Sequence, residues 1–233
     1  MSKIIICNHK MFLTYDEALN LENRLLEINY DNLIICPSFL NLNLFSNFKL
    51  GVQNCHYEDR GAFTGQVSAY NLSLRNVKYC IVGHSEVRNY DSDEVINLKI
   101  KNILKNSMTP ILCIGENKYE HEMMKTYEVL KKQLKLGLKD VKLDKYQCIY
   151  IAYEPIYLIG GKKALSKSTI IDTVKLIKKI LNELGIDNFK ILYGGAVNKN
   201  NIDKLLDEEI DGFLLGKSST NIDELKYIIN CVK

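Results

Sequence analysis

The 233-residue sequence predicts a (β/α)8 barrel, an α/β fold in which eight parallel strands alternate with helices. Eight short and almost continuously apolar runs recur along the chain, as is typical of strands buried on both faces. Stretches with helical periodicity separate most of these runs, which favours a parallel sheet. No linker rich in proline, glycine and serine divides the chain, so we expect one domain over residues 1–233.

The predicted strands define the barrel. They are 3–7, 32–36, 49–53, 79–83, 109–114, 147–153, 190–194 and 211–216. An open, doubly wound sheet is the competing architecture. Such a sheet rarely needs eight evenly spaced units, and no G-x-G-x-x-G motif follows the first strand. The closed barrel is therefore the better interpretation.

The predicted helices follow from apolar residues that recur with helical spacing. They are 14–28, 92–104, 119–138, 168–184, 198–206 and 221–231. The helix at 92 opens with Ser-Asp-Glu, which is a start signal. The connection 54–76 after the third strand is long, and we expect it to be only partly helical.

Composition narrows the class of protein. Lys and Arg exceed Asp and Glu by 31 − 28 = 3, which is too few to favour a nucleic acid or an anionic membrane as partner. The apolar run at the N-terminus is too short for a signal peptide, and no later segment is long enough to span a bilayer. The seven cysteines show no close pair, which is typical of a reducing compartment. We therefore expect a cytoplasmic protein.

Polar residues follow several predicted strands directly. Asn8 and Lys10 follow the first strand, His84 the fourth and Glu154 the sixth. The glycine turns YGGAV and LLGKS follow the last two strands, at 193–197 and 214–218. Because the chemistry of (β/α)8 barrels lies at the C-terminal ends of the strands, we expect these groups to meet at one mouth.

These residue types suit proton transfer. Glu154 lies before Pro155 and an apolar loop that would keep water away, as suits a general base, although a salt-bridged acid would also fit. His84 lies at a strand-to-helix turn that favours a neutral imidazole, and a structural histidine is the alternative. Lys10 is either a functional cation or a solvated rim lysine. The glycine turns expose N–H groups and open helices, which makes an anion site. Together these groups suggest proton transfer next to a carbonyl on a small phosphorylated substrate.

Seven motifs carry a resemblance that covers essentially the whole chain. They are NHK (8–10), GAFTGQVS (61–68), IVGHSEVR (81–88), CIGE (113–116), AYEPIYLIGG (152–161), YGGAV (193–197) and LLGKSS (214–219). Their sequence and order resemble the triosephosphate isomerase family. The resemblance implies a TIM barrel that interconverts D-glyceraldehyde 3-phosphate and dihydroxyacetone phosphate, in glycolysis and gluconeogenesis. It implies no metal and no cofactor, because the reaction is only proton transfer.

The resemblance also implies roles, which are the established ones of the family. Glu154 is the base, His84 the electrophile, and Lys10 a cation near the phosphate and the enediolate. Asn8 helps to place substrate and lysine, and Glu86 is a buried acid near Lys10. The backbone N–H groups that hold the phosphate are those around Gly160, Ala196, Gly216 and Lys217. A homodimer forms through Gln53, Asn54 and the loop around Thr64, which reaches the neighbour's Asn8 and His84.

The chain departs from the family pattern in the lid and at the interface. His9 and Tyr157 stand where tryptophans are usual, and Ala196 replaces a serine that helps to hold the closed lid. The other departures are Gln66, Val87, Leu158, Gly161, Lys162 and Lys217.

Two other functions remain open at this point. One is a different phosphate-binding barrel such as a lyase or a Schiff-base aldolase, although such an aldolase needs a lysine at a central strand end. The other is a barrel without catalysis.

Overall fold

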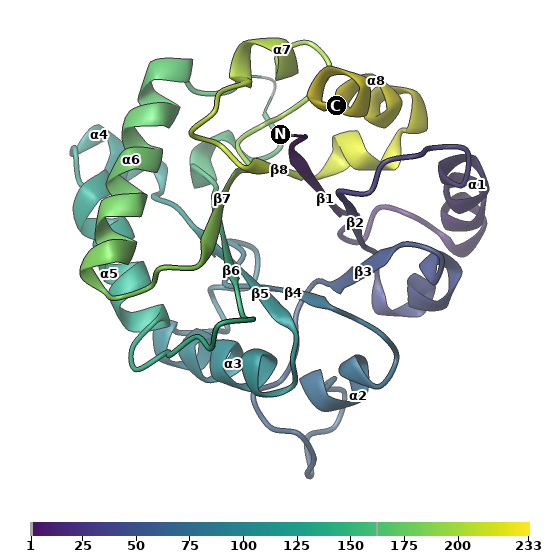
Figure 1. Ribbon diagram of the computed structural model, residues 1–233, viewed down its shortest axis with the longest axis horizontal. Coiled ribbons are helices and arrows are strands. Elements are labelled where there is room, and N and C mark those ends of the chain that lie inside the picture. The colour runs from purple at the N-terminus through teal and green to yellow at the C-terminus, as the bar shows by residue number, and fades with distance from the viewer. Residues whose placement is uncertain (1, 162) are drawn as a thin grey trace.

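The computed structural model describes residues 2–161 and 163–233, and its eight parallel strands form a closed barrel (Figure 1). The strands are β1 Ile4–Asn8, β2 Leu33–Cys36, β3 Lys49–Val52, β4 Tyr79–Val82, β5 Thr109–Ile114, β6 Ile149–Tyr153, β7 Phe189–Tyr193 and β8 Gly212–Leu215. Each strand pairs with its neighbour in sequence, and β1 pairs with β8 to close the ring. The predicted (β/α)8 barrel is confirmed, and the open sheet is excluded.

Helices surround the barrel. The α-helices are α1 Tyr15–Leu25, α2 Ala69–Ser73, α3 Asp93–Lys105, α4 Lys118–Glu122, α5 Thr126–Gly137, α6 Lys167–Glu183, α7 Ile202–Leu205 and α8 Ile222–Val232. The short 3-10 helices of the described residues are η1 Phe39–Phe45, η2 Ile156–Leu158 and η3 Lys217–Thr220. Side chains define several helix starts. Thr14 forms a capping box with Glu17, and Ser92 accepts a hydrogen bond from the Val95 N–H.

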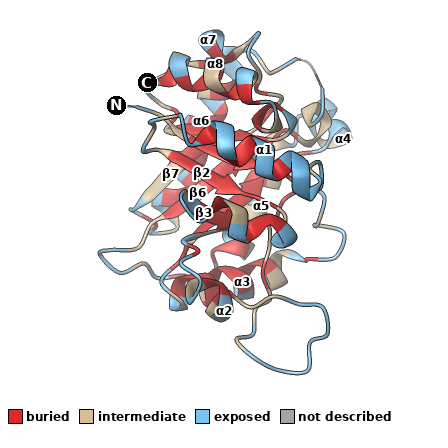
Figure 2. Ribbon diagram, turned by 90° about the vertical axis from the view of Figure 1, so that its right-hand side faces the viewer, coloured by how far each residue is buried: buried red, intermediate tan, exposed pale blue. Residues whose placement is uncertain are grey.

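Two buried clusters of side chains explain why the strands are apolar along their whole length. One contains only strand residues and fills the barrel interior, with Ile6, Ile81 and Leu192 among them. The other joins the opposite strand faces to the helices, as Ile5 and Ile177 illustrate. Figure 2 shows the buried strands enclosed by helices whose outer faces are exposed. Successive strand residues point to opposite faces, so a strand that is buried on both faces must be apolar at every position.

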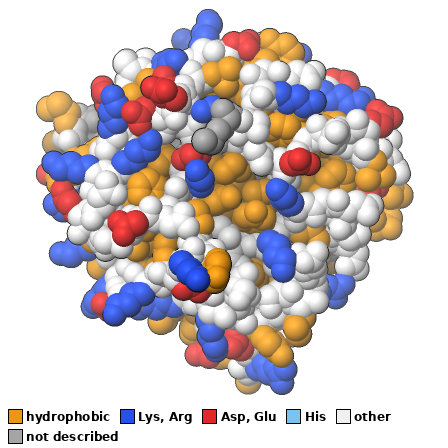
Figure 3. Space-filling view, viewed as in Figure 1, with side chains coloured by type: hydrophobic (Ala, Val, Ile, Leu, Met, Phe, Trp, Pro, Cys, Tyr) orange, Lys and Arg blue, Asp and Glu red, His pale blue; other side chains and the backbone are white. Residues whose placement is uncertain are grey.

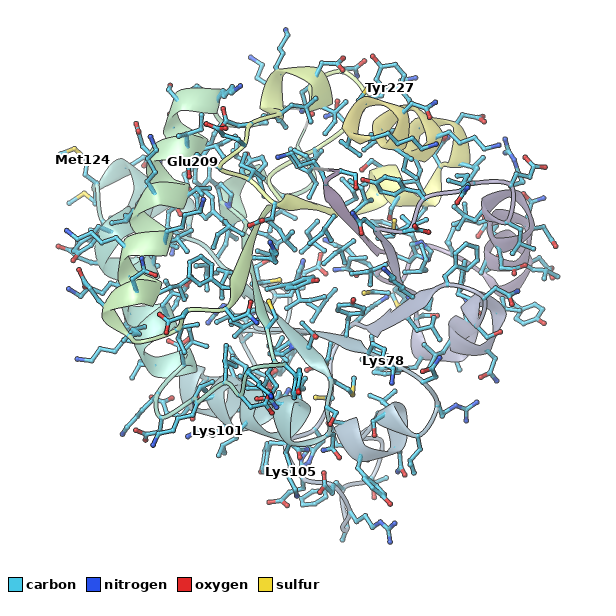
Figure 4. The ribbon with its side chains drawn as sticks, in the orientation of Figure 1. Lys78, Lys101, Lys105, Met124, Glu209 and Tyr227 are labelled. Atoms are coloured by element: carbon cyan, nitrogen blue, oxygen red, sulfur yellow. The ribbon has the colours of Figure 1, made fainter. Side chains whose placement is uncertain are left out.

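Two predicted helices are wrong in extent. The stretch 119–138 forms two helices, α4 and α5, because Met124 adopts a left-handed conformation with φ 55° between them. Met124 lies at the outer edge of the molecule, where no buried contact opposes such a break (Figure 4). The stretch 198–206 contains only the single turn of α7, since Asn198 and Asn201 side chains bond the local backbone instead.

The surface agrees with the small net charge. Figure 3 shows basic and acidic side chains interspersed on the face in view. Within residues 2–161 and 163–233, no helix is both long and apolar enough to cross a membrane. All seven cysteines are free thiols, and Cys7, Cys36, Cys55, Cys80 and Cys113 are buried.

Candidate active site

One cavity of about 1240 Å³ lies at the C-terminal ends of the strands and continues outward between the starts of α1 and α8. All eight predicted site residues line it. They are Asn8, Lys10, His84, Glu154, Gly160, Ala196, Gly216 and Lys217. Strands β1, β4, β6, β7 and β8 carry these groups to one mouth although the residues are far apart in sequence.

Glu154 is the buried acid of this mouth. It directly follows β6, its side chain is only 7% exposed, and its Oε1 lies 3.7 Å from Nε2 of His84. The other oxygen, Oε2, is buried and has no hydrogen-bond partner in the part of the chain that the structure describes. The Glu154 residue lines the cavity, and its carboxylate forms no salt bridge with a lysine or arginine in the described residues. This geometry suits a proton acceptor.

His84 presents a neutral imidazole to the cavity. The backbone N–H of Glu86 donates a hydrogen bond of 3.2 Å to Nδ1, so that nitrogen carries no proton and the N–H lies on Nε2. The predicted cause of this state is wrong. Residues 85–90 form turns, and α3 begins only at Asp93. The neutral state is therefore stabilised by the single N–H of Glu86 and not by a helix N-terminus.

Lys10 adopts a left-handed backbone conformation with φ 49°, and three hydrogen bonds hold it. Its N–H donates to Oδ1 of Asn8 at 3.1 Å, and its carbonyl accepts from Nε2 of Gln53 at 2.9 Å. Its Nζ donates to Oε1 of Glu86 at 2.8 Å. The prediction that Glu86 is near Lys10 is confirmed. The prediction that Glu86 is buried is wrong for this chain, because the turn at 85–90 leaves its side chain 56% exposed at the rim.

The two glycine turns differ from expectation in one respect. LLGKS opens a helix directly, because η3 begins at Lys217. YGGAV does not, because α7 begins only at Ile202. Ala196 adopts a left-handed conformation with φ 52°, which turns the backbone at the cavity wall. Both turns nevertheless line the cavity with Lys10, whose Cε lies beside Gly216.

The segment 155–165 after Glu154 is the expected lid. It begins with η2, and Gly160 turns the backbone with φ 76°. Ile159, Gly160 and Gly161 line the cavity, and the Leu165 N–H donates to the hydroxyl oxygen of Tyr193 at 3.2 Å. Lys162, one of the altered positions, lies outside the described residues.

Sequence reasoning missed the residues that make room for Glu154 and hold Lys10. A Cβ at Gly194 would lie 2.7 Å from Cγ of Glu154, and one at Gly115 would lie 1.9 Å from its carbonyl oxygen. Only glycine fits such contacts. Gln53, expected at an interface, supports the Lys10 turn from β3. The position of Gly115 and Gly194 directly after a strand could be read from the sequence, but their contact with Glu154 could not.

His9, between Asn8 and Lys10 in the sequence, is buried, with 2% of its surface exposed. Its ring meets Phe45 edge-on at 5.3 Å, and neither ring nitrogen has a hydrogen-bond partner in the described part of the chain. Burial lowers the pKa of His9 to about 4.

We expect His9 to make the protein less stable in mild acid. The pKa of an unfolded histidine is about 6.5, so between about pH 6.5 and 4 the unfolded chain binds a proton that the folded chain does not. The free energy of unfolding therefore decreases as the pH is lowered from about 6.5 to about 4. The total decrease is roughly 3 kcal/mol, at about 1.4 kcal/mol per pH unit. Urea unfolding of His9→Phe at fixed protein concentration should show a flatter pH profile than the parent protein. Identical slopes would contradict the assignment.

No group of three or more His, Cys, Asp or Glu side chains that could hold a metal occurs in residues 2–161 and 163–233. The four predicted catalytic residues instead supply an amide (Asn8), an ammonium (Lys10), an imidazole (His84) and a carboxylate (Glu154) to the cavity. This set can bind an anion and move a proton.

Comparison with known proteins agrees with this geometry. The sequence model of the family "Triosephosphate isomerase" matches residues 3–232. The triosephosphate isomerase of Alkaliphilus metalliredigens is 37% identical, over 97% of this chain and 98% of that protein. The triosephosphate isomerases of Clostridium tetani and Alkaliphilus oremlandii are 35% and 36% identical, over 97% of this chain and 95% and 98% of those proteins. A match of this extent leaves one conclusion: the chain belongs to the triosephosphate isomerase family.

Proposed function

We propose that this protein interconverts D-glyceraldehyde 3-phosphate and dihydroxyacetone phosphate by proton transfer through an enediolate. The observation that carries the proposal is the buried Glu154, which lines a cavity shared with a neutral His84 and with Lys10 and forms no salt bridge with a lysine or arginine in the described residues. Family membership supports the same reaction. The reaction is a step of glycolysis and gluconeogenesis, and the seven free thiols suit the reducing cytoplasm in which these pathways run.

Glu154 would begin the reaction as the base. Its carboxylate takes a proton from the carbon next to the carbonyl, and the electron pair of that C–H bond forms the carbon–carbon double bond of the enediolate. The carbonyl oxygen becomes an oxyanion. Glu154 then returns the proton to the former carbonyl carbon. The hydroxyl proton of the other carbon passes to the former carbonyl oxygen through the imidazole of His84, so the carbonyl now stands on the other carbon. Burial helps, because a carboxylate shielded from water is a stronger base.

His84 and Lys10 would stabilise the oxyanion. The Nε2–H of His84 lies on the Glu154 side of the imidazole, so it can donate to the oxygen as charge develops. The ammonium of Lys10 is held over Gly216 by Glu86 and adds a positive charge at the same mouth. Asn8 holds the backbone of Lys10 in place.

The backbone N–H groups around Gly160, Ala196, Gly216 and Lys217 would bind the phosphate. These residues line the cavity together with the lid, so a bound phosphate would draw the lid onto the substrate. The exposed side chain of Lys217 adds charge at this rim. A Schiff-base aldolase is less compatible, because the strand end that carries the buried group presents a carboxylate.

The direct test is to incubate the purified protein with each triose phosphate in D₂O and follow both by NMR. We expect conversion in both directions, with deuterium incorporated at the carbon next to the carbonyl. A lyase would release phosphate and an aldolase would join or cleave carbon chains. A folded protein that gives either of those products, or none, would contradict the proposal.

We also propose a homodimer that forms through the loop around Thr64. Residues 60–66 are exposed in the single chain, and this loop before α2 projects beyond the barrel (Figures 1 and 2). Phe63 at its tip region is 39% exposed, which suits a segment that a partner covers. Sedimentation at micromolar concentration should give the mass of two chains, and a monomer would contradict this proposal.

A further inference from the structure

A buried acid that the proposed mechanism does not use lies at the base of the lid. Glu116 follows β5 and has no exposed surface. Its Oε1 accepts a hydrogen bond of 3.1 Å from the hydroxyl of Tyr153, and its Oε2 is buried without a partner in the described part of the chain. Its backbone carbonyl accepts from the N–H of Ile156, the first residue of η2, at 3.0 Å. Glu116 is thus joined to the start of the lid.

His121 on α4 connects this acid to the lid. Its Nδ1 lies 3.5 Å from Oε1 of Glu116. Its ring lies 4.7 Å from the ring of Tyr157, with 32° between the planes. Tyr157 is the middle residue of η2 and stands three positions after Glu154, and its hydroxyl is buried without a partner in the described residues. One imidazole therefore contacts both a buried carboxylate and the first turn of the lid.

Other charged groups near His121 have their own partners or are in solvent. On α4, Lys118 pairs with Glu122 at 3.8 Å, and the carboxylate of Glu120 accepts from the Asn117 N–H at 2.8 Å. Lys125 and Glu128, at the start of α5, are exposed. From β6 and the lid, Tyr153 contacts Glu116 and Tyr157 contacts His121, and burial raises the pKa of each hydroxyl. Burial also raises the pKa of Glu116, so this acid is harder to ionise than an exposed glutamate, and a cation beside it favours its charged form.

We propose that His121 is a positioning residue for the lid, and that its protonation stabilises the lid position seen in the structure. The inference rests on the proposed function, because it concerns the lid of the same site. A protonated imidazole donates a charge-assisted hydrogen bond to Glu116 and places a cation against the ring of Tyr157. A neutral imidazole provides neither the charge-assisted hydrogen bond to Glu116 nor the cation against Tyr157. Histidine is the side chain whose charge normally changes between about pH 5 and 8.

The consequence concerns ligand affinity. In this position, Ile159, Gly160 and Gly161 line the cavity, and Leu165 is bonded to Tyr193 at the far end of the lid. His121 holds the near end. A ligand in the cavity that contacts the lid must bind more tightly when this position is more populated. Lower pH should therefore strengthen binding through His121.

The test is the affinity of 2-phosphoglycolate, a phosphorylated mimic of the enediolate, measured by calorimetry at about pH 5.5 and about pH 8. His121→Gln cannot be charged in this range, and His121→Arg is always charged. At the lower pH, we expect His121→Gln to bind about fivefold more weakly than the parent protein and His121→Arg to match it. At the higher pH, His121→Gln should match the parent protein and His121→Arg should bind about fivefold more tightly. Each variant is compared with the parent protein at the same pH, so protonation of the ligand itself affects both affinities equally.

Tyr157→Ala is the matched control, because it removes the ring through which His121 would act. In that background, His121→Gln should no longer change the affinity at either pH. Melting temperatures should show that every variant is folded, as expected for a side chain that is 42% exposed. A ratio between His121→Gln and the parent protein that is the same at both pH values would overturn the inference. A folded parent protein that fails to bind 2-phosphoglycolate at either pH would instead contradict the proposed function.

Discussion

Replacing Glu154 with glutamine should lower kcat by roughly a thousandfold, within the 10²–10⁴ range typical of a general base. The amide has almost the same shape as the carboxylate, so it should still pack against Gly194, which directly follows β7. It cannot accept the carbon-bound proton. The effect should therefore appear in kcat, while the affinity for 2-phosphoglycolate changes much less.

Glu154→Asp is the matched control, since it keeps the charge and shortens the side chain by one methylene. A displacement of about 1 Å can cost about a hundredfold in rate, so this variant should be active but slow. Exchange of the substrate's carbon-bound hydrogen in D₂O should fall in parallel with turnover in both variants. If Glu154→Gln keeps a rate within tenfold of the parent protein, the base is another group.

Replacing Lys10 with methionine should lower kcat/KM by about 10²–10³, the range found when one preorganised electrostatic contact to a developing charge is lost. The Lys10 side chain is only 16% exposed and its ammonium is held by Glu86, so its position is set before substrate arrives. Methionine keeps much of the apolar stem but has no charge. Because the ammonium would serve both the phosphate and the oxyanion, we expect KM to rise as well as kcat to fall.

Lys10→Arg separates charge from geometry. Its cation is retained, but the wider guanidinium must fit where Cε of Lys10 already lies beside Gly216. We expect activity between that of the parent protein and that of Lys10→Met. If Lys10→Met and the parent protein have equal kcat/KM, Lys10 is a rim lysine without a part in catalysis. Circular dichroism would show that both variants keep the secondary structure of the parent protein.

Much of the barrel was predictable from the sequence, because burial on both faces leaves a direct trace in composition. Each predicted strand overlaps an observed one, and Glu154 follows β6 as expected. The break between α4 and α5 was not predictable. Because α4 has no buried residue, the spacing of its apolar residues does not correspond to packing against the barrel. A left-handed residue at an exposed position such as Met124 leaves no such trace.

The sequence by itself determined which residues meet at the mouth, because parallel strands that alternate with helices must bring all their C-terminal ends to one side. Asn8, Lys10, His84 and Glu154 line one cavity for this reason. Only the tertiary structure decided their states. The N–H that sets the His84 tautomer comes from a turn, Glu86 lies in solvent at the rim, and Gly194 gives Glu154 its space from forty positions away. Such contacts depend on atomic distances across neighbouring strands and turns, and a pattern along one chain does not record them.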